Sequence, residues 1–408
     1  MVRAVAVFAA ALPLFSGSAW AQSQSQPEDD PRSTARMHVG PFYLTPVIAV
    51  KNVGVDTNVF NTADDPKSDF TATIGPDIDV YIPISLASLS VKSLTDFVYF
   101  HSFASERSIN EDLVVRGEVP IRRLTLFSEN SYLNTRERPN FEIDARSRRV
   151  ENQFEVGVSV DLARKLSVQV SGRQASIEFD ADEFFQGNSL AERLNRDSRT
   201  AAVALNYQLT PITTVVLTGE VTETRFRLSP LRDSDSFSIV PGVEFNPRSI
   251  ISGSAHVGFR KFVGLNASLP GFEGTVAAVD LRYRLLGSTV IGVTVDRNID
   301  YSFEIDDPYY VATGYGGSVR RQLGSRFDAI VAAQQYTYRY RGLEGEAEQD
   351  LASERIDTRR NYSFSIGYRR NRGARFDVSV SYWQRRSDER DFQNYQGFRL
   401  GSNVTYGF

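Results

Sequence analysis

The chain has 408 residues and a formal net charge of −4, from 46 basic and 50 acidic side chains, so nothing in its charge favours a nucleic-acid partner. It has no cysteine, which excludes a fold held by disulfides. Beyond an apolar run at the N-terminus, no segment is apolar enough for a transmembrane helix. A helical membrane protein is thereby excluded, but a β-barrel is not, because its strands need apolar residues only at alternate positions.

The first 21 residues have the order of a secretory signal peptide. Arg3 precedes an apolar run over residues 4–15, and Ala19-Trp20-Ala21 has the A-x-A pattern of a cleavage site. The run of about 12 residues is too short to span a bilayer, which takes roughly 20, so an uncleaved anchor is the weaker alternative. We predict cleavage near Ala21, followed by a polar, disordered periplasmic tail over residues 22–40.

From residue 41 to residue 408 apolar and polar residues alternate with a period of two. In residues 69–82, for example, Phe70 falls on one face of a strand, while Asp77 and Asp79 fall on the other. A helix would need apolar residues three and four positions apart, and no such stretch appears. The pattern therefore predicts a single all-β domain over residues 41–408.

The connections between the predicted strands are of two kinds. Short turns are predicted near residues 83–88, 120–123, 161–165, 209–213, 246–249, 285–288, 322–325 and 370–374. Longer polar segments are predicted near residues 56–68, 102–110, 134–147, 179–198, 227–236, 262–271, 303–309, 340–358 and 386–396. The two kinds alternate, which predicts about 18 antiparallel strands with short periplasmic turns and long extracellular loops, the layout of an outer-membrane barrel. A secreted β-sandwich or propeller is the alternative, but the sequence has no blade repeat.

The polar face of each strand should line the lumen of such a barrel. The candidate lumen-lining residues are Asp77, Asp79, Glu155, Arg173, Glu220, Glu244, Arg260, Asp280, Arg282, Arg284, Arg320, Tyr336, Tyr338, Arg369, Trp383 and Arg385. Acids prevail in the first half and bases in the second, so the charges either create a field across an aqueous channel or pair into a structural network. No strongly basic lumen is evident, which favours a neutral or weakly charged cargo. The aromatic members either stack on sugar rings or belong to an interface girdle.

The long loops carry acidic and basic groups. The acidic clusters have no fixed ligand spacing, so we expect solvated loops, with neither a metal nor another cofactor. Arginines at the outer strand ends suit the phosphates of lipopolysaccharide or other outer-membrane lipid. These arginines are Arg136, Arg138, Arg146, Arg148, Arg149, Arg193, Arg196, Arg199, Arg359 and Arg360. Loops 179–198 and 340–358 are long enough to fold into the lumen as constrictions.

Catalysis is not expected. His101 and Ser102 are adjacent in sequence, and adjacent strand residues point to opposite faces, so they cannot form a nucleophile–base pair. Neither a G-x-S-x-G elbow nor an H-E-x-x-H motif occurs.

The start of the predicted barrel resembles a known family. Residues 44–61, LTPVIAVKNVGVDTNVFN, and residues 64–80, DDPKSDFTATIGPDIDV, are similar to the opening of the bacterial outer-membrane family called putative β-barrel porin 2. Members have an early Pro in strand 1, then a Y-D-S-N-V-F-like stretch and a D-P-x-S-D-like loop. The matching positions here are Pro46, Val55 to Phe60, Asp65-Pro66, Ser68-Asp69 and Pro76, with Val55 in the aromatic position and Thr57 for Ser.

The resemblance implies a role in exopolysaccharide or capsule production, to which members are often linked. The chain would then be an outer-membrane exit channel for a polysaccharide, working with an inner-membrane synthesis system and a periplasmic polysaccharide-export protein. A general or substrate-specific porin for small solutes is one alternative, and a structural or adhesive barrel is another.

The C-terminal strand ends on an aromatic residue. Val404, Tyr406 and Phe408 fall on its outward face. A final strand with a terminal Phe resembles the signal that the barrel assembly machinery recognises, so we expect that machinery to be a partner. We also expect this strand to pair with the first strand near Pro46, which removes the last open edge of the sheet.

Overall fold

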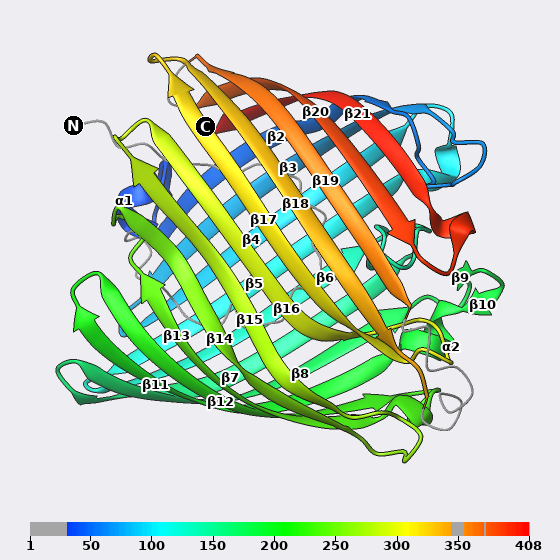
Figure 1. Ribbon diagram of the computed structural model, residues 1–408. Helices are drawn as coiled ribbons and strands as arrows, with labels where there is room; N and C mark the ends of the chain where they lie inside the picture. The colour runs from blue at the N-terminus through cyan, green and yellow to red at the C-terminus, as the bar shows by residue number, and fades with distance from the viewer. Residues whose placement is uncertain (1–30, 344–354, 371–372, 408) are drawn as a thin grey trace.

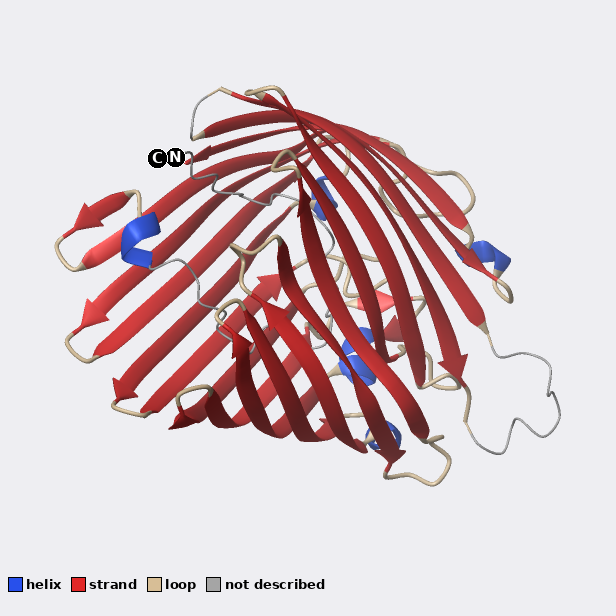
Figure 2. Cartoon of the chain, turned by 60° about the vertical axis from the view of Figure 1, so that its left-hand side comes forward, coloured by secondary structure: helices blue, strands red, loops and turns tan. Residues whose placement is uncertain are grey.

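The computed structural model describes residues 31–343, 355–370 and 373–407, and most of them lie in antiparallel strands (Figures 1 and 2). The predicted signal peptide, the first part of the predicted tail and the terminal Phe408 lie outside these ranges. Within them, no helix has both the length and the apolar content needed to cross a bilayer.

The described part of the chain forms one large sheet of 19 strands, and 18 of these, β2–β8 and β11–β21, make up the barrel. The barrel strands are β2 (Phe42–Asp56), β3 (Asp69–Ile84), β4 (Ala87–Phe100), β5 (Ser108–Ile121), β6 (Leu124–Thr135), β7 (Arg149–Ala163), β8 (Leu166–Phe179), β11 (Arg196–Thr210), β12 (Thr213–Phe226), β13 (Ser234–Phe245), β14 (Ile251–Gly264), β15 (Phe272–Leu285), β16 (Thr289–Tyr301), β17 (Tyr309–Leu323), β18 (Phe327–Arg341), β19 (Ile356–Arg369), β20 (Ala374–Ser387) and β21 (Tyr395–Gly407). The predicted strand number is confirmed.

The barrel closes between its first and last strands. β21 pairs antiparallel with β2, from Val47 opposite Gly407 to Asp56 opposite Arg399. The register shifts once, at a bulge where Asn52 has a φ of 55°. Closure leaves no open edge, as a sheet in hydrocarbon requires, since every backbone donor and acceptor must be bonded within the protein. The pairing near Pro46 that the sequence predicted is confirmed.

The two ends of the barrel differ as the alternation of short and long connections predicts. The predicted short turns are found, apart from residues 371–372 of the turn at 370–374, which lie outside the described residues. The turns lie at the same end as the start of β2 and the end of β21 (Figure 1). In the tightest turns the backbone adopts left-handed conformations, as at Ser85 and Arg122. The long loops lie at the other end and carry α2 (Leu190–Leu194), the hairpin of β9 (Phe184–Phe185) and β10 (Asn188–Ser189), and 3₁₀ turns at Ala104–Glu106, Pro230–Arg232 and Asp391–Gln393.

The two faces of each strand have different partners. On β3, the apolar side chains of Phe70, Ile74 and Ile78 are exposed on the outside, where lipid would cover them. The alternate residues, such as Asp77 and Asp79, point to the inside. The same alternation continues around the barrel, so the outer surface is an apolar band and the polar half of the sequence faces the lumen.

The N-terminal segment departs from the prediction. A short helix, α1 (Pro31–Thr34), is followed by β1 (Met37–Val39), which pairs antiparallel with the start of β2. The ring of His38 stacks on Tyr43 at 4.5 Å between centroids, and the main-chain N–H of Arg36 donates to Leu44 O. These contacts order residues 31–39, which corrects the disordered tail predicted over residues 22–40 for that part.

Candidate functional site

One extracellular loop, residues 136–148, crosses the lumen. It joins β6 to β7, yet its Phe141 stacks on Tyr338 of β18, with ring centroids 3.3 Å apart and an interplanar angle of 8°. Phe141 also meets the ring of Tyr310 on β17 edge-on at 5.1 Å. β17 and β18 lie on the far side of the closed strand order from β6 and β7. Residues 136–148, the crossing loop, therefore reach from one wall of the barrel to the other.

The local sequence of the crossing loop sets its turn. The side-chain oxygen of Asn140 accepts hydrogen bonds from the main-chain N–H groups of Glu142 (2.9 Å) and Ile143 (3.0 Å). Asn is suited to this because its short amide mimics a backbone turn. At the base of the loop, Ser147 N–H donates to Glu137 O at 3.5 Å. The loop is thus narrow where it leaves the wall and turned at its tip.

Arg385 on β20 holds the tip of the crossing loop. Its side chain has no exposed area, and it donates to Phe141 O at 3.0 Å and to Asp144 Oδ2 at 3.1 Å. The same guanidinium donates to Asp357 Oδ2 and to Gln393 Oε1, both at 2.7 Å. Buried charges need such partners, because an unpaired charge in a dry site is costly. We call Arg385 and its four partners the arginine latch.

Glu142 docks the crossing loop onto the loop between β16 and β17. Its carboxylate accepts from Ser302 Oγ at 2.8 Å and from Phe303 N–H at 2.9 Å, and the residue is fully buried. Burial raises the pKa of Glu142, although both hydrogen bonds favour its charged form. Burial likewise raises the pKa of Asp144, despite the neighbouring Arg385. Both carboxyls of the docked loop therefore hold protons more readily than they would in water.

The opposite flank of the crossing loop is bound to the loop between β2 and β3. Arg138 and Arg146 both donate to Val59 O, at 2.6 Å and 3.2 Å, and Asn61 Nδ2 donates to Asp144 Oδ1 at 3.0 Å. Arg146 also pairs with Glu106 at 3.2 Å. Burial, together with the nearby Arg138, lowers the pKa of Arg146 to about 10. The crossing loop is thus tied on both flanks as well as at its tip.

Apolar packing completes the arrangement. Ile143 is fully buried against Leu190 and Leu194 of α2 and against Phe303. Ser189 caps the N-terminus of α2, and its hydroxyl accepts a hydrogen bond from the N–H of Glu192. The apolar side of α2 therefore faces the mouth of the barrel. The predicted constriction loop 179–198 packs into the mouth of the barrel. Its apolar residues there contact Ile143 of the crossing loop and Phe303.

Two further arginines join neighbouring loops to this assembly. Arg232 is buried and donates to the carbonyl oxygens of Ser302, Phe303 and Glu304, and burial lowers its pKa to about 10. Arg390 pairs with the carboxylate of Glu304. We call the crossing loop with the loops bound to it the loop layer. It lies at the extracellular end of the lumen, with several fully buried side chains at its centre.

The structure places the predicted lumen-lining residues on the inward faces of their strands but in three different environments. Near the extracellular end, Tyr338 and Arg385 are covered by the crossing loop, and Trp383 Nε1 donates to Asn61 Oδ1 at 3.0 Å. These three strand residues contact the loop layer and are not open pore lining, which corrects that part of the prediction. Tyr336 is half-buried beside Tyr338, at 6.0 Å between ring centroids.

In the middle of the barrel the predicted charges are paired or buried. Arg173 Nε donates to Glu155 Oε2 at 3.2 Å, and both side chains are largely buried. Arg260 donates to Asn298 Oδ1 at 2.7 Å. Glu220 is buried on β12 opposite Ala202 and Ser238, with Arg173 on β8 and Arg260 on β14 each two strands away. Adjacent side chains of small size, such as Ser238, leave these long side chains room to lie against the wall.

Toward the periplasmic end the charged side chains range from half exposed to largely buried. Arg282 and Asp280 pair at 2.7 Å, with side chains 42% and 50% exposed. The remaining predicted residues of this region are Asp77, Asp79, Glu244, Arg284, Arg320 and Arg369. Glu244 lies 3.8 Å from His256, and Arg369 lies 4.0 Å from Asp328, which also pairs with Arg375 at 2.7 Å.

Sequence reasoning missed the residues that matter most to the loop layer. Phe141, Glu142 and Ile143 fall in a segment that the sequence predicts only as a long polar loop, residues 134–147, and Asp357 falls in the one predicted over residues 340–358. A signal was present in Phe141 and Ile143, two apolar residues with strand-like spacing inside a segment otherwise rich in charge. Most of the other predicted constriction loop, 340–358, lies outside the described residues.

The arginines predicted to meet lipid phosphates divide into two groups. Arg138, Arg146 and Arg149 turn into the loop layer, where Arg149 donates to Glu137 O. Arg196 faces inward over the ring of Tyr301. Arg148, the residue before β7, instead bonds to Asn134 on the outward face of β6. Among residues 31–343, 355–370 and 373–407, no group of three or more His, Asp or Glu is placed to hold a metal ion.

Solved structures to which the chain is similar include three from Pseudomonas aeruginosa. In solved structures, the fold is similar to Pseudomonas aeruginosa OccK3 (OpdO), with a TM-score of 0.47 and 9% identity over 90% of this chain and 95% of that chain. It is similar to OccK1 (OpdK) of the same organism, with a TM-score of 0.48 and 8% identity over 90% and 98%. The siderophore receptor PirA from Pseudomonas aeruginosa gives 0.43 and 8%, over 90% and 80%. No curated protein matches the sequence.

A family model settles the relationship that the opening residues suggested. The model described as putative beta-barrel porin 2 matches residues 30–408, which is nearly the whole chain and includes every strand of the barrel. The match and the closed 18-stranded barrel place the protein in the bacterial outer membrane. The chain belongs to the putative beta-barrel porin 2 family.

Proposed function

We propose that this protein is a porin for small polar solutes, whose extracellular mouth is narrowed by the crossing loop. The observation that carries the proposal is the docking of residues 136–148 on the opposite wall, through the stacking of Phe141 on Tyr338 and the bonds from Arg385. Side chains with no exposed area lie in the mouth of the barrel, where a wide conduit would need open water. Such an arrangement suits passage of solutes one at a time.

The charges below the loop layer support a polar cargo of no strong net charge. Asp280 and Arg282 are half-exposed and opposite in sign on the same strand. Acids prevail on the inward faces of the first strands, as at Asp77 and Asp79, and arginines on the last strands, as at Arg369. A field across a lumen holds a dipolar or zwitterionic solute weakly while giving little advantage to ions of either sign.

The test is single-channel recording of the purified full chain in planar bilayers, together with liposome swelling in sugars of increasing size. In the key variant, a Gly-Ser-Gly linker replaces residues 139–145, which the narrow base of the loop allows. We expect larger conductance and a larger size limit. As a matched control, the same linker replaces residues 64–66, an exposed loop tip, and should leave both unchanged. Equal conductance in wild type and the key variant would contradict the proposal.

Export of a polysaccharide, which the family resemblance implies, stays a prediction. An export channel should abolish surface polysaccharide when the gene is deleted, while the synthesis enzymes stay active. A deletion strain that secretes normal amounts of polymer but takes up small solutes more slowly would favour the porin. The reverse pattern would favour export. An adhesive barrel would lose function when the loop tips are removed and keep it when the pore is blocked.

We also propose how the chain reaches the membrane. Removal of the signal peptide near Ala21 would leave Gln22 at the N-terminus, which sequencing of the mature protein would reveal. Recognition of the last strand by the barrel assembly machinery would depend on its outward residues, among them Val404 and Tyr406 beside β2. Deletion of Phe408 should slow insertion of the barrel before it alters transport through barrels already inserted.

A further inference from the structure

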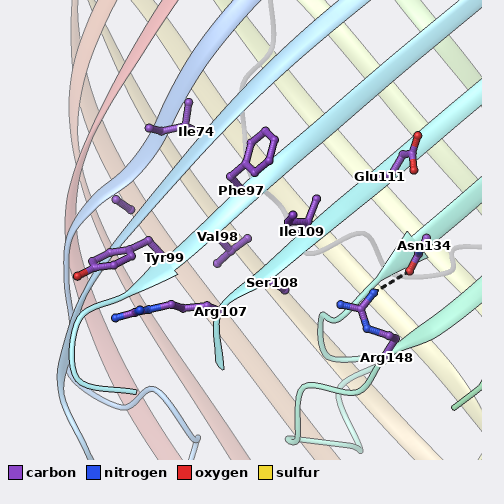
Figure 3. Close-up of a pocket in the computed structure, with 11 residues that line it drawn as sticks. Ile74, Phe97, Val98, Tyr99, Arg107, Ser108, Ile109, Glu111, Asn134 and Arg148 are labelled. Atoms are coloured by element: carbon purple, nitrogen blue, oxygen red, sulfur yellow. Dashed lines mark hydrogen bonds between the residues drawn. The ribbon is translucent and has the colours of Figure 1, made fainter. Parts of the chain in front are cut away.

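An open groove lies on the outer surface of the barrel, at the extracellular end of β3–β6 (Figure 3). It holds about 880 Å³, within the range of roughly 300–1,000 Å³ that small-molecule sites occupy. Its floor includes Ile74, Phe97 and Ile109, whose side chains belong to the exposed apolar face of their strands. The groove therefore opens toward lipid and not toward the lumen.

The extracellular edge of the groove is polar and carries two arginines. Arg107 lies over the ring of Tyr99, with its guanidinium carbon 4.5 Å from the ring centroid, and Arg148 donates to Asn134 Oδ1 at 3.1 Å (Figure 3). Neither guanidinium pairs with a carboxylate within the described residues, and Arg107 is exposed. An exposed Tyr at a strand end marks the membrane interface, so both cations lie at headgroup level.

Two other outward arginines at this end of the barrel, Arg225 and Arg227, are paired with carboxylates. Arg225 pairs with Asp235 at 2.8 Å, and Arg227 pairs with Glu178 at 2.7 Å and with Asp197 at 2.9 Å. Their charge is neutralised by neighbouring strands. Arg107 and Arg148 differ from this pair because no carboxylate of the described residues pairs with them, and they border an apolar groove.

We propose that this groove binds a phosphorylated glycolipid of the outer leaflet. An acyl chain would lie along the floor at Ile74 and Ile109, where burial of apolar area favours it. Arg107, over Tyr99 of β4, and Arg148, bonded to Asn134 of β6, lie two strands apart, so each would hold a separate phosphate of the headgroup. A guanidinium suits this role because it forms paired, charge-assisted hydrogen bonds to phosphate oxygens. Glu111, which lines the same groove opposite Asn134, would accept hydrogen bonds from the hydroxyl or amide groups of a sugar headgroup, which a simple phospholipid offers less.

The test is native mass spectrometry of the detergent-solubilised full chain titrated with bisphosphorylated lipid A. Dephosphorylated lipid A, phosphatidylglycerol and inorganic phosphate are run in parallel. In the double variant Arg107→Gln/Arg148→Gln we expect affinity for lipid A to fall by about tenfold or more, the loss that charge-assisted bonds to a phosphate imply. The dephosphorylated lipid should bind the wild type as weakly as lipid A binds the variant.

Two further variants make the result specific. Arg225→Gln removes an outward arginine that is already paired and should leave the affinity unchanged. Ala72→Phe fills the groove floor, keeps both arginines and should also weaken binding. A difference in gel mobility between unheated and heated samples of each variant verifies that the barrel has folded.

Four outcomes would overturn the proposal. They are unchanged affinity in the double variant, equal binding of phosphatidylglycerol, competition by inorganic phosphate alone, or a stable dimer that covers the groove in place of lipid.

Discussion

The two ends of the lumen use the same kinds of side chain in opposite ways. At the extracellular end, Arg385 and Asp357 have no exposed side-chain area and are bonded 2.7 Å apart within the arginine latch. At the periplasmic end, Arg282 and Asp280 form a pair of the same length whose side chains stay about half exposed. Both pairs point inward from barrel strands. The difference is that long loops cover one end, whereas two- to five-residue turns leave the other open.

The comparison teaches that an inward charge is not in itself a pore-lining charge. Where loops exclude water, the charged side chains pair with one another and with loop carbonyl oxygens, and these bonds fix the position of the loops. Where water remains, the pairs are weak and the charges stay available to a solute. We therefore expect the extracellular end to control access and the periplasmic end to control selectivity.

The largest effect should follow from Arg385→Ala. The substitution leaves Asp357 and Asp144 short of a buried partner, and breaking a buried ion pair in this way costs about 3–5 kcal/mol. We expect the crossing loop to detach, so that conductance rises toward that of the linker variant and the melting temperature falls. Arg282→Ala at the open end is the matched control and should change stability by about 1 kcal/mol at most. Similar losses in both variants would contradict the division between the two ends.

Glu142 should make access depend on pH. The carboxyls of Glu142 and Asp144 have raised pKa values in the docked loop and ordinary values once the loop is in water. The docked state therefore binds more protons, and docking gains stability as pH falls through the raised values and loses it as pH rises. We expect wild-type conductance to fall on acidification, as single-channel recordings at pH 5 and 7.5 would show. Glu142→Gln should give low conductance at both values and a flatter profile. Conductance that rises on acidification would contradict the prediction that protonation stabilises the docked loop.

A smaller effect is expected from Phe141→Leu. The substitution keeps an apolar side chain at the tip of the crossing loop but removes the stacking on Tyr338 and the edge contact with Tyr310. Aromatic pairs contribute about 0.5–1.5 kcal/mol beyond the area they bury, which shifts the docked population about two- to tenfold. Brief openings should become more frequent in single-channel traces. Phe392→Leu, at an exposed position in another extracellular loop, is the control and should leave the traces unchanged.

Whether a feature of this protein can be predicted from the sequence depends on how far apart in the chain the interacting residues lie. The strands, the turns and the inward faces follow from a period of two and from turn residues, which are local signals. The latch joins Arg385 to Phe141, 244 positions apart, and no local pattern encodes that contact. The loop 136–148 is rich in charge, a composition that is typical of a solvent-exposed loop. Its charged side chains instead bond to neighbouring loops. Closure of the barrel also joins residues far apart in the chain, but it could be predicted because unbonded backbone groups at a sheet edge are too costly in hydrocarbon.

The smallest effect on stability should come from substitutions at the periplasmic end. These substitutions also give the sharpest test of ion selectivity. Asp280→Asn and Arg282→Gln each remove one charge from a half-exposed pair, which costs about 1 kcal/mol or less. Because loops do not cover these groups, total conductance should stay near the wild-type value while the preference between cations and anions shifts. Asp280→Asn should move the reversal potential in a salt gradient toward anion preference, and Arg282→Gln should move it toward cation preference. The double variant should return to the wild-type potential, since it removes both signs together. Shifts of equal sign in the two single variants would mean that the pair acts on the position of the loops instead, and the separation of access from selectivity would then fail.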